Sequence, residues 1–437
     1  MKVRLLSLAV LGVGGGLVIA ATAGGGPASE QGANQRIRGN ISIVSEATGP
    51  EIRYFKAVLA DFEKKFPNVN VKYTSAGRQL PQILSTAVQG GRPPDLALIP
   101  QPALVRQFVQ RRALKPITFV RGAINRNWGP AWVQLGSFNG RLYSLYYKGA
   151  NKSTVWYNTD LFRRAGVRSP RTFNQFLTAA RTLRASGARA YSIGGASGWT
   201  LTDLFENIYL KQAGPRLYDQ LSTHRIKWTH SSVKAALRTM GRVFSDTDNI
   251  AGGTDGALQT DFDTSVSQVF ADPPKAAMII EADFVSGVIT GSTKAKPRTD
   301  FNYFPFPSFK ASTANSVLSG GDAVVMFKDN PAARALVRYF TTPQAAEIRI
   351  RAAGGFTSPN KRVRMTAYKT ALDRQIARAL TTAKTVRFDL SDLQPAQFGA
   401  TEGQGLWKLF QDFLRSPNNV DGIATEMERA AARAYRR

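Results

Sequence analysis

The 437-residue sequence contains no cysteine and only two histidines. Without cysteine, the chain can form no disulfide, iron–sulfur cluster or thiolate zinc site, and it has no cysteine nucleophile. His224 and His230 lie in one short stretch, so a two-histidine metal site is cramped, and a serine hydrolase would have few bases to choose from. We therefore expect a protein that is not an enzyme and that holds no metal and no cofactor.

Acidic residues are also scarce, because 30 aspartates and glutamates stand against 58 lysines and arginines, which gives a formal net charge of +28. Such a balance is typical of proteins whose neighbour is a nucleic acid, an anionic membrane or an anionic cell wall. The alternative is a solvated basic surface. The basic residues are scattered, apart from a denser end at 429–437. We expect no nucleic-acid partner, and a polyanion-binding protein is kept as an alternative.

Sequence motifs for nucleotide and ester chemistry are missing. The chain contains neither the phosphate-binding pattern G-x-x-x-x-G-K-[ST] nor the nucleophile pattern G-x-S-x-G. Asp246, Asp248 and Asp255 flank a glycine-rich turn, but Ile250 and Ala257 stand where a calcium loop needs ligands. This turn is interpreted as a solvated acidic turn.

The first 23 residues have the pattern of a secretory signal peptide. Lys2 and Arg4 precede an uncharged, mostly apolar stretch that ends in the sequence Ala21-Thr22-Ala23, which suits signal peptidase. An uncleaved membrane anchor is the alternative, since about 19 apolar residues can just span a bilayer. We expect export to the periplasm or to the extracellular face of the envelope, without a cysteine-linked lipid. Residues 24–39 are predicted to be a flexible linker.

Strand and helix patterns then alternate. Strands are predicted at 41–44, 69–73 and 95–99, and helices at 51–66, 81–89 and 103–111. This alternation predicts a parallel sheet covered by helices, whose ligands lie at the carboxyl ends of the strands. The segments in that position are 48–51, 75–78 and 100–102.

Aromatic and acidic side chains suggest the chemistry of the site. Six tryptophans are present, and a sugar receptor needs flat rings for the apolar faces of the sugar and planar polar groups for its hydroxyls. Trp199 lies in a Gly/Ser loop just before Asp203 and Glu206, which share one face of a helix. The two acids could contact a ligand, stabilise the helix start, or act as the acid and nucleophile of a glycosidase.

Several segments together resemble one family, the extracellular solute-binding proteins of carbohydrate ABC transporters in the maltose-binding-protein superfamily. The similarity is greatest to the α-glucoside-binding branch. The segments that carry the resemblance are TGPEIRYFKAVLADFEKKFPNVNVKY (48–73), GGRPPDLALIPQPALV (90–105), VWYNTDLFRRAGVRSPRTFNQFL (155–177), SGWTLTDLFENIYL (197–210), SGGDAVVMFKDNPAARALVRYFTTPQAA (319–346), GGFTSPNK (354–361) and RFDLSDLQP (387–395).

The resemblance implies a two-lobed α/β periplasmic-binding-protein fold of type II, with a hinge and a ligand cleft between the lobes. It places 40–155 plus 317–370 in the first lobe and 156–316 plus 371–437 in the second. It also implies the function: a monomer that captures an α-glucoside or related oligosaccharide and delivers it to a membrane permease with its ATPase. The alternatives are a polyol or peptide as the solute, or a glycoside-active enzyme that uses Asp203 and Glu206.

The resemblance also assigns ligand contacts by position. They lie in the strand-end loops, in the tryptophan-containing loop and in the later turns. The residues are Glu51, Arg78, Gln101, Trp156, Trp199, Asp203, Asp283, Phe284, Gly321, Asp322, Asp392 and Trp407.

Overall fold

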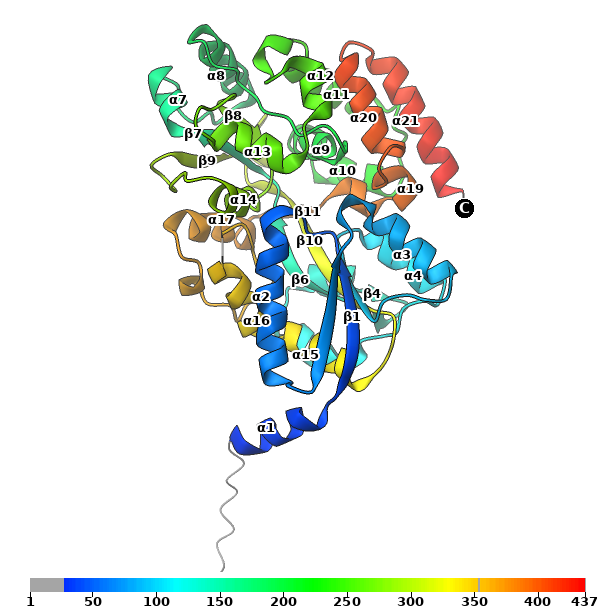
Figure 1. Ribbon diagram of the computed structural model, residues 1–437. Coiled ribbons are helices and arrows are strands. Elements are labelled where there is room, and N and C mark those ends of the chain that lie inside the picture. The colour runs from blue at the N-terminus through cyan, green and yellow to red at the C-terminus, as the bar shows by residue number, and fades with distance from the viewer. Residues whose placement is uncertain (1–26, 353, 437) are drawn as a thin grey trace, which may run out of the picture.

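The computed structural model describes residues 27–352 and 354–436, which form two lobes stacked one above the other (Figure 1). The predicted signal peptide lies outside the described residues. Within them, no helix combines the length and the apolar character needed to cross a membrane.

The predicted alternation builds the first lobe. The elements are β1 (Gly39–Ser45), α2 (Gly49–Lys65), β2 (Val69–Ser75), α3 (Leu80–Gln89), β3 (Leu96–Ile99) and α4 (Pro102–Gln110). β1 is parallel to both β2 and β3. The apolar face of α2, including Phe55 and Phe62, packs into the same core as Ile41 and Ile43 of β1. Because the three strands are parallel, the loops after them meet at one edge of the sheet.

Later segments complete this sheet. β6 (Ser144–Asn151) and β3 both pair antiparallel with β10 (Ser316–Met326), and β11 (Thr385–Phe388) pairs parallel with β10. The strand order is therefore β11-β10-β3-β1-β2, with β6 paired to β10. The further elements are α5 (Arg121–Asn127), α6 (Pro130–Leu135), β4 (Ser137–Phe138), β5 (Arg141–Leu142), α15 (Pro331–Phe340), α16 (Pro343–Ala352) and α17 (Ala371–Thr381). The predicted lobe boundary at residue 371 assigns β11 to the second lobe, but β11 is part of the sheet of the first lobe.

The second lobe has a small antiparallel sheet of β7 (Thr154–Asn158) between β8 (Met278–Ile280) and β9 (Phe301–Pro305). Its helices are α7 (Thr159–Arg164), α8 (Phe173–Ala185), α9 (Trp199–Ala213), α10 (Pro215–Ser222), α11 (Ser231–Phe244), α12 (Gly253–Gln259), α13 (Phe262–Phe270), α14 (Val285–Ser292), α18 (Leu390–Leu393), α19 (Ala396–Gly399), α20 (Gly405–Arg415) and α21 (Val420–Tyr435). The core lies around α9, α11 and α20, and it contains Phe205, Trp228 and Phe410.

The chain passes between the lobes at three places that lie side by side. The first follows β6, the second precedes β10, and the third follows β11. They are hydrogen bonded to one another: the Lys152 amide donates to the Leu318 carbonyl at 2.8 Å, and the Asp389 amide donates to the Ser319 carbonyl at 2.7 Å. Ser153 Oγ accepts the Leu318 amide at 2.9 Å. These contacts make the three crossings one connected hinge.

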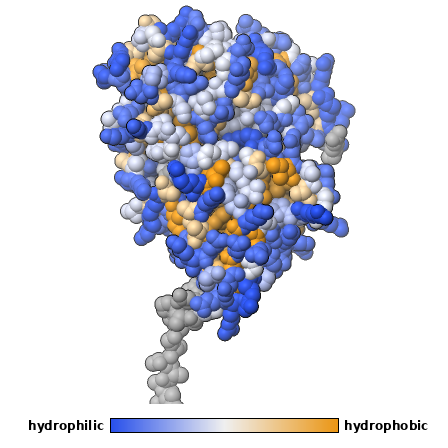
Figure 2. Space-filling view, viewed as in Figure 1, coloured by the Kyte–Doolittle hydropathy of each residue, from blue (hydrophilic) through white to orange (hydrophobic). Residues whose placement is uncertain are grey.

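The segment before β1 differs from its prediction. Residues 24–39 are predicted to be a flexible linker, but Pro27–Arg36 form helix α1, which lies below the first lobe (Figure 1). Asn68 Nδ2 donates to the Gln35 carbonyl at 2.7 Å, so the end of α1 is tied to the turn between α2 and β2. The face of the molecule in Figure 2 is largely hydrophilic, with apolar residues in patches on the first lobe.

The two lobes touch beside the hinge, where α14 of the second lobe lies against α2 of the first. Tyr54 Oη donates to the Gly287 carbonyl at 3.4 Å. A Cβ atom at Gly291 would stand 2.6 Å from Tyr54 Oη and 2.7 Å from Pro50 Cβ. Only glycine therefore permits this approach of the two helices.

We expect Gly291→Leu to hold the lobes apart, because its side chain needs the space that Tyr54 and Pro50 occupy. Small-angle scattering should show a larger radius of gyration, and affinity for any ligand enclosed between the lobes should fall about tenfold or more. Gly122→Leu is the matched control, since a Cβ atom there meets only the flexible end of Arg126. Equal scattering curves for both variants and the parent would contradict the expectation.

Candidate functional site

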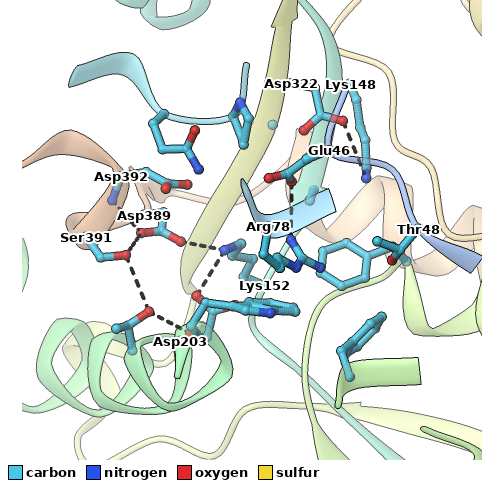
Figure 3. Close-up of a pocket in the computed structure, with 18 of the residues that line it drawn as sticks. Glu46, Thr48, Arg78, Lys148, Lys152, Asp203, Asp322, Asp389, Ser391 and Asp392 are labelled. Atoms are coloured by element: carbon cyan, nitrogen blue, oxygen red, sulfur yellow. Dashed lines mark hydrogen bonds and ion pairs between the residues drawn. The ribbon is translucent and has the colours of Figure 1, made fainter. Parts of the chain in front are cut away.

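A cavity lies between the lobes at the carboxyl ends of the parallel strands (Figure 3). It encloses about 730 Å³ of space free of protein atoms, part of it open to solvent. That size suits a small-molecule ligand. Ten of the twelve predicted residues line it, namely Glu51, Arg78, Gln101, Trp199, Asp203, Phe284, Gly321, Asp322, Asp392 and Trp407.

Two predicted contacts lie elsewhere. Trp156 is 0% exposed in the core of the second lobe, where its Nε1 donates to Thr154 Oγ1 and to the Ala282 carbonyl, each at 3.0 Å. Asp283 is also buried and accepts a hydrogen bond from Thr357 Oγ1 at 2.6 Å. The structure therefore corrects both assignments: Trp156 packs in β7, and Asp283 joins the start of α14 to the first lobe.

Aromatic rings form the wall contributed by the second lobe. Trp199 lies 5.3 Å from Phe262 and 6.1 Å from Phe284, measured between ring centroids. Trp407 packs in the same cluster. Gly198, with φ of +87°, starts α9 where a Cβ atom would stand 2.5 Å from the Trp407 carbonyl oxygen, so glycine is required for this packing.

An arginine of the first lobe covers the Trp199 ring. The guanidinium carbon of Arg78 lies 4.5 Å from the ring centroid, within cation–π range. Arg78 Nη1 also lies 3.5 Å from Glu46 Oε1. The contact therefore joins the 75–78 segment of the first lobe to α9 of the second, across the cavity.

Lys152 forms a buried ion cluster at the hinge. Its Nζ donates to Asp203 Oδ1 at 3.0 Å and also to Asp389 Oδ2. Burial opposes a charge on Lys152, but the two carboxylates raise its pKa well above the usual range. Burial opposes the charge of Asp389 as well and alone would raise its pKa, yet Lys152 lowers this pKa to about 2. Lys152 therefore carries its charge inside the protein.

A second ion cluster lies on the side of the cavity that the first lobe forms. Lys148 Nζ donates to Glu51 Oε1 at 3.2 Å and lies 3.6 Å from Asp322 Oδ2. It also lies 5.0 Å from the centroid of the Phe284 ring. Gly321 has no room for a side chain, because a Cβ atom would stand 2.3 Å from the Lys148 carbonyl oxygen. The close pairing of β6 and β10 thus places Lys148 in the cavity.

Several carboxyl groups hold their protons more firmly than usual. Burial raises the pKa of Glu46 to about 7 and raises the pKa of Asp203 well above the usual range. Burial also raises the pKa of Glu281 to about 7. The pKa of Asp392 is raised well above the usual range by burial and by Asp389.

Three buried polar atoms of the lining lack a hydrogen-bond partner among the residues that the structure describes. They are the acceptor Gln101 Oε1, the carboxyl oxygen Asp203 Oδ2 and the donor Trp407 Nε1. Gln101 is 3% exposed and Trp407 is 5% exposed. Buried polar groups are normally hydrogen bonded, so the three atoms define what a ligand must supply: a donor for Gln101, an acceptor for Trp407 and a polar partner for Asp203.

Sequence reasoning missed several lining residues, including Glu46, Lys148, Lys152, Asp389 and Ser391. Glu46 and Asp389 directly follow β1 and β11, so the rule that ligands lie at strand ends could have found both. Lys148 lies within a strand and Lys152 at the hinge, where only the pairing of β6 with β10 reveals which way they face.

The predicted pair of acids is divided between two roles. Asp203 lines the cavity, whereas Glu206 accepts the amides of Leu390 at 2.6 Å and Ser391 at 2.9 Å. Asp203, Glu206 and Asp389 lie close enough together to hold a metal ion. However, Lys152 Nζ donates to two of these carboxylates, and the amides at the start of α18 occupy the third. The donor set thus suits the ammonium group of Lys152 rather than a metal.

The acidic turn at 246–255 holds no cluster of ligands either. Asp246 pairs with Arg184, and Asp248 pairs with Arg189 at 2.8 Å. Two of the three aspartates of this turn, Asp246 and Asp248, are therefore engaged in ion pairs with arginines.

The fold agrees with comparisons to known proteins. The chain belongs to the bacterial extracellular solute-binding protein family, whose profile matches residues 47–347. This membership confirms the predicted family and the predicted two-lobed fold.

Particular relatives cover most of the chain. The α-glucosides-binding periplasmic protein AglE of Rhizobium meliloti is 30% identical over 406 residues, which span 89% of this chain and 86% of AglE. The osmoprotective compounds-binding protein GgtB of Synechocystis sp. is 28% identical over 394 residues, 89% of this chain and 91% of GgtB. Among solved structures, a chitin oligosaccharide binding protein superposes with a TM-score of 0.78 at 18% identity, covering 92% of this chain and all of that one (100%).

We expect the stability of the ligand-free protein to fall as the pH rises from about 4.5 to about 7. Burial raises the pKa of Glu281 from 4.5 to about 7, so the folded state binds this proton more tightly than the unfolded chain. Glu281→Gln should flatten this slope and raise the free energy of unfolding at pH 8 by on the order of 2 kcal/mol. Chemical denaturation at pH 5 and pH 8 measures the effect.

Glu347→Gln is the control of opposite sign. Arg364 hydrogen bonds to Glu347 and lowers its pKa, so this variant should lose stability at neutral pH. If Glu281→Gln lost stability at pH 8 as well, the raised pKa of Glu281 in the folded protein would be wrong.

Proposed function

We propose that this protein is the substrate-binding component of an ABC sugar importer, and that it captures an α-glucoside or a related oligosaccharide in the cavity between its lobes. The protein is exported, binds its sugar as a monomer, and delivers it to a membrane permease that works with an ATPase. Bond chemistry has no part in this function.

The observation that carries the proposal is the combination of ring faces and hydroxyl partners in one cavity. Trp199 and Trp407 offer flat apolar surface to the C–H face of a sugar. Asp203, Asp322 and Gln101 offer oxygens that accept hydroxyl protons. A neutral, hydroxyl-rich ring matches such a mixture of apolar faces and acceptors.

The relatives support the same class of ligand. AglE is named for binding α-glucosides, and its similarity extends over both lobes. The structure titled chitin oligosaccharide binding protein supports a carbohydrate in this fold. The division of the chain into lobes, with the hinge at the three crossings, supports closure around the ligand.

A second candidate ligand is a small polyhydroxy osmolyte, since GgtB is named for binding osmoprotective compounds. A linear polyol has hydroxyl groups but no ring face. The contribution of the aromatic wall therefore distinguishes the two ligands.

A thermal-shift screen tests the proposed class directly. Maltose, trehalose or sucrose should raise Tm, because a ligand that binds only the folded state stabilises it by about 2.7 kcal/mol at 100 times its Kd. Linear polyols, amino acids and short peptides serve as the comparison. A shift with peptides and none with any sugar would overturn the proposal. Steady hydrolysis of an aryl α-glucoside that Asp203→Ala abolishes would establish the enzyme instead.

Trp199→Ala should weaken sugar binding by about 1–3 kcal/mol, or roughly 5- to 150-fold in Kd, because it removes an aromatic platform from the cavity. Titration calorimetry with the sugar found in the screen measures the loss. Trp156→Phe is the matched control: it changes a buried tryptophan outside the cavity, so it should lower stability and leave Kd nearly unchanged. Equal losses of affinity in both variants would show that Trp199 acts only through stability.

A further inference from the structure

The lining of the cavity has the opposite charge to the rest of the chain. The formal charge of the whole sequence is +28. Seven carboxyl groups nevertheless line the cavity, against three cations, Arg78, Lys148 and Lys152. The lining thus has an excess of four acidic groups, and an anionic solute is poorly matched to it.

The three cations already have partners. Lys152 forms ion pairs with Asp203 and Asp389, and Lys148 forms ion pairs with Glu51 and Asp322. Arg78 forms an ion pair with Glu46. Two lining carboxyl groups, Asp263 and Asp392, are left without a cation. Among the described residues, no group hydrogen bonds to the carboxylate of Asp392 or forms an ion pair with it. The residue is 7% exposed and lines the cavity, where Figure 3 shows it beside Asp389 and across from Glu46.

Ionising Asp392 in the empty cavity is costly. Burial and the neighbouring charge of Asp389 both raise the pKa of Asp392. A positive group placed against Asp392 would remove that cost and gain a charge-assisted hydrogen bond. A neutral hydroxyl would offer only a weaker bond.

The aromatic wall also accepts positive charge. Arg78 lies over Trp199 at 4.5 Å, and Lys148 lies over Phe284 at 5.0 Å. The chain therefore already uses two of its ring faces to hold cations, as expected of rings in a partly desolvated cavity. A cationic ligand that replaces Arg78 on Trp199 keeps this interaction.

We propose that the cavity selects a glycoside that carries a protonated amine, with the carboxylate of Asp392 as the partner of the ammonium group. This inference rests on the proposed function and narrows its substrate class from neutral sugars to amino-substituted ones. The specificity comes from an acidic group with no partner in the protein and from ring faces suited to a cation.

Calorimetry on the full chain at pH 7 tests the proposal with matched probes. The probes are maltose and trehalose, their derivatives with an amine at carbon 2 or carbon 6, and the N-acetylated form of each amine. At least one amine should bind about tenfold or more tightly than its parent sugar, and N-acetylation, which removes the charge, should abolish the gain. Amines that all bind no tighter than their parent sugars would overturn the inference while leaving the proposed function intact.

The variant Asp392→Asn tests whether Asp392 is the residue that binds the ammonium group. The ratio of parent-sugar Kd to amine Kd should fall to about one, whatever the variant does to both affinities. Asp255→Asn, an exposed aspartate outside the cavity, should keep the parent ratio. An unchanged ratio in Asp392→Asn would overturn the assignment. If choline bound and no sugar or amino sugar did, the proposed function would fail and with it the inferred glycoside.

Discussion

The charge of Lys152 constrains the rest of the structure. Its ammonium group lies where the chain first leaves the large sheet, and its two partners come from α9 and from the residue after β11. A buried charge is tolerated only when its partners are in place, so the three segments must be positioned together. The same contact therefore orients Asp203 toward the ligand cavity and holds the first and third crossings side by side. Hinge and binding site are parts of one electrostatic arrangement.

The sequence predicted the first lobe well because its signals are local. Alternating strands and amphipathic helices located β1 to α4 within a few residues, and the parallel topology then placed Glu51, Arg78 and Gln101 at one edge. Trp156 was assigned wrongly, because a tryptophan in a strand has the same pattern whether it faces a cavity or a core. Lys148 and Lys152 were missed because their direction depends on pairing with β10, far away in the sequence.

The distribution of charge separates two functions of the same chain. The exterior carries the large positive excess, while the enclosed cavity carries an acidic one. A basic exterior is attracted to anionic surfaces such as those of a cell envelope.

Arg78 lies on the ring of Trp199 and therefore competes with any ligand that would stack there. Under the proposed function, a ligand that stacks on Trp199 must displace this side chain of the opposite lobe, so it gains only the difference between its own stacking and that of Arg78. The same exchange acts in reverse at release, when Arg78 returns to the ring and fills the face that the ligand leaves. Under the proposed function, this exchange lowers the affinity for the ligand and favours its release.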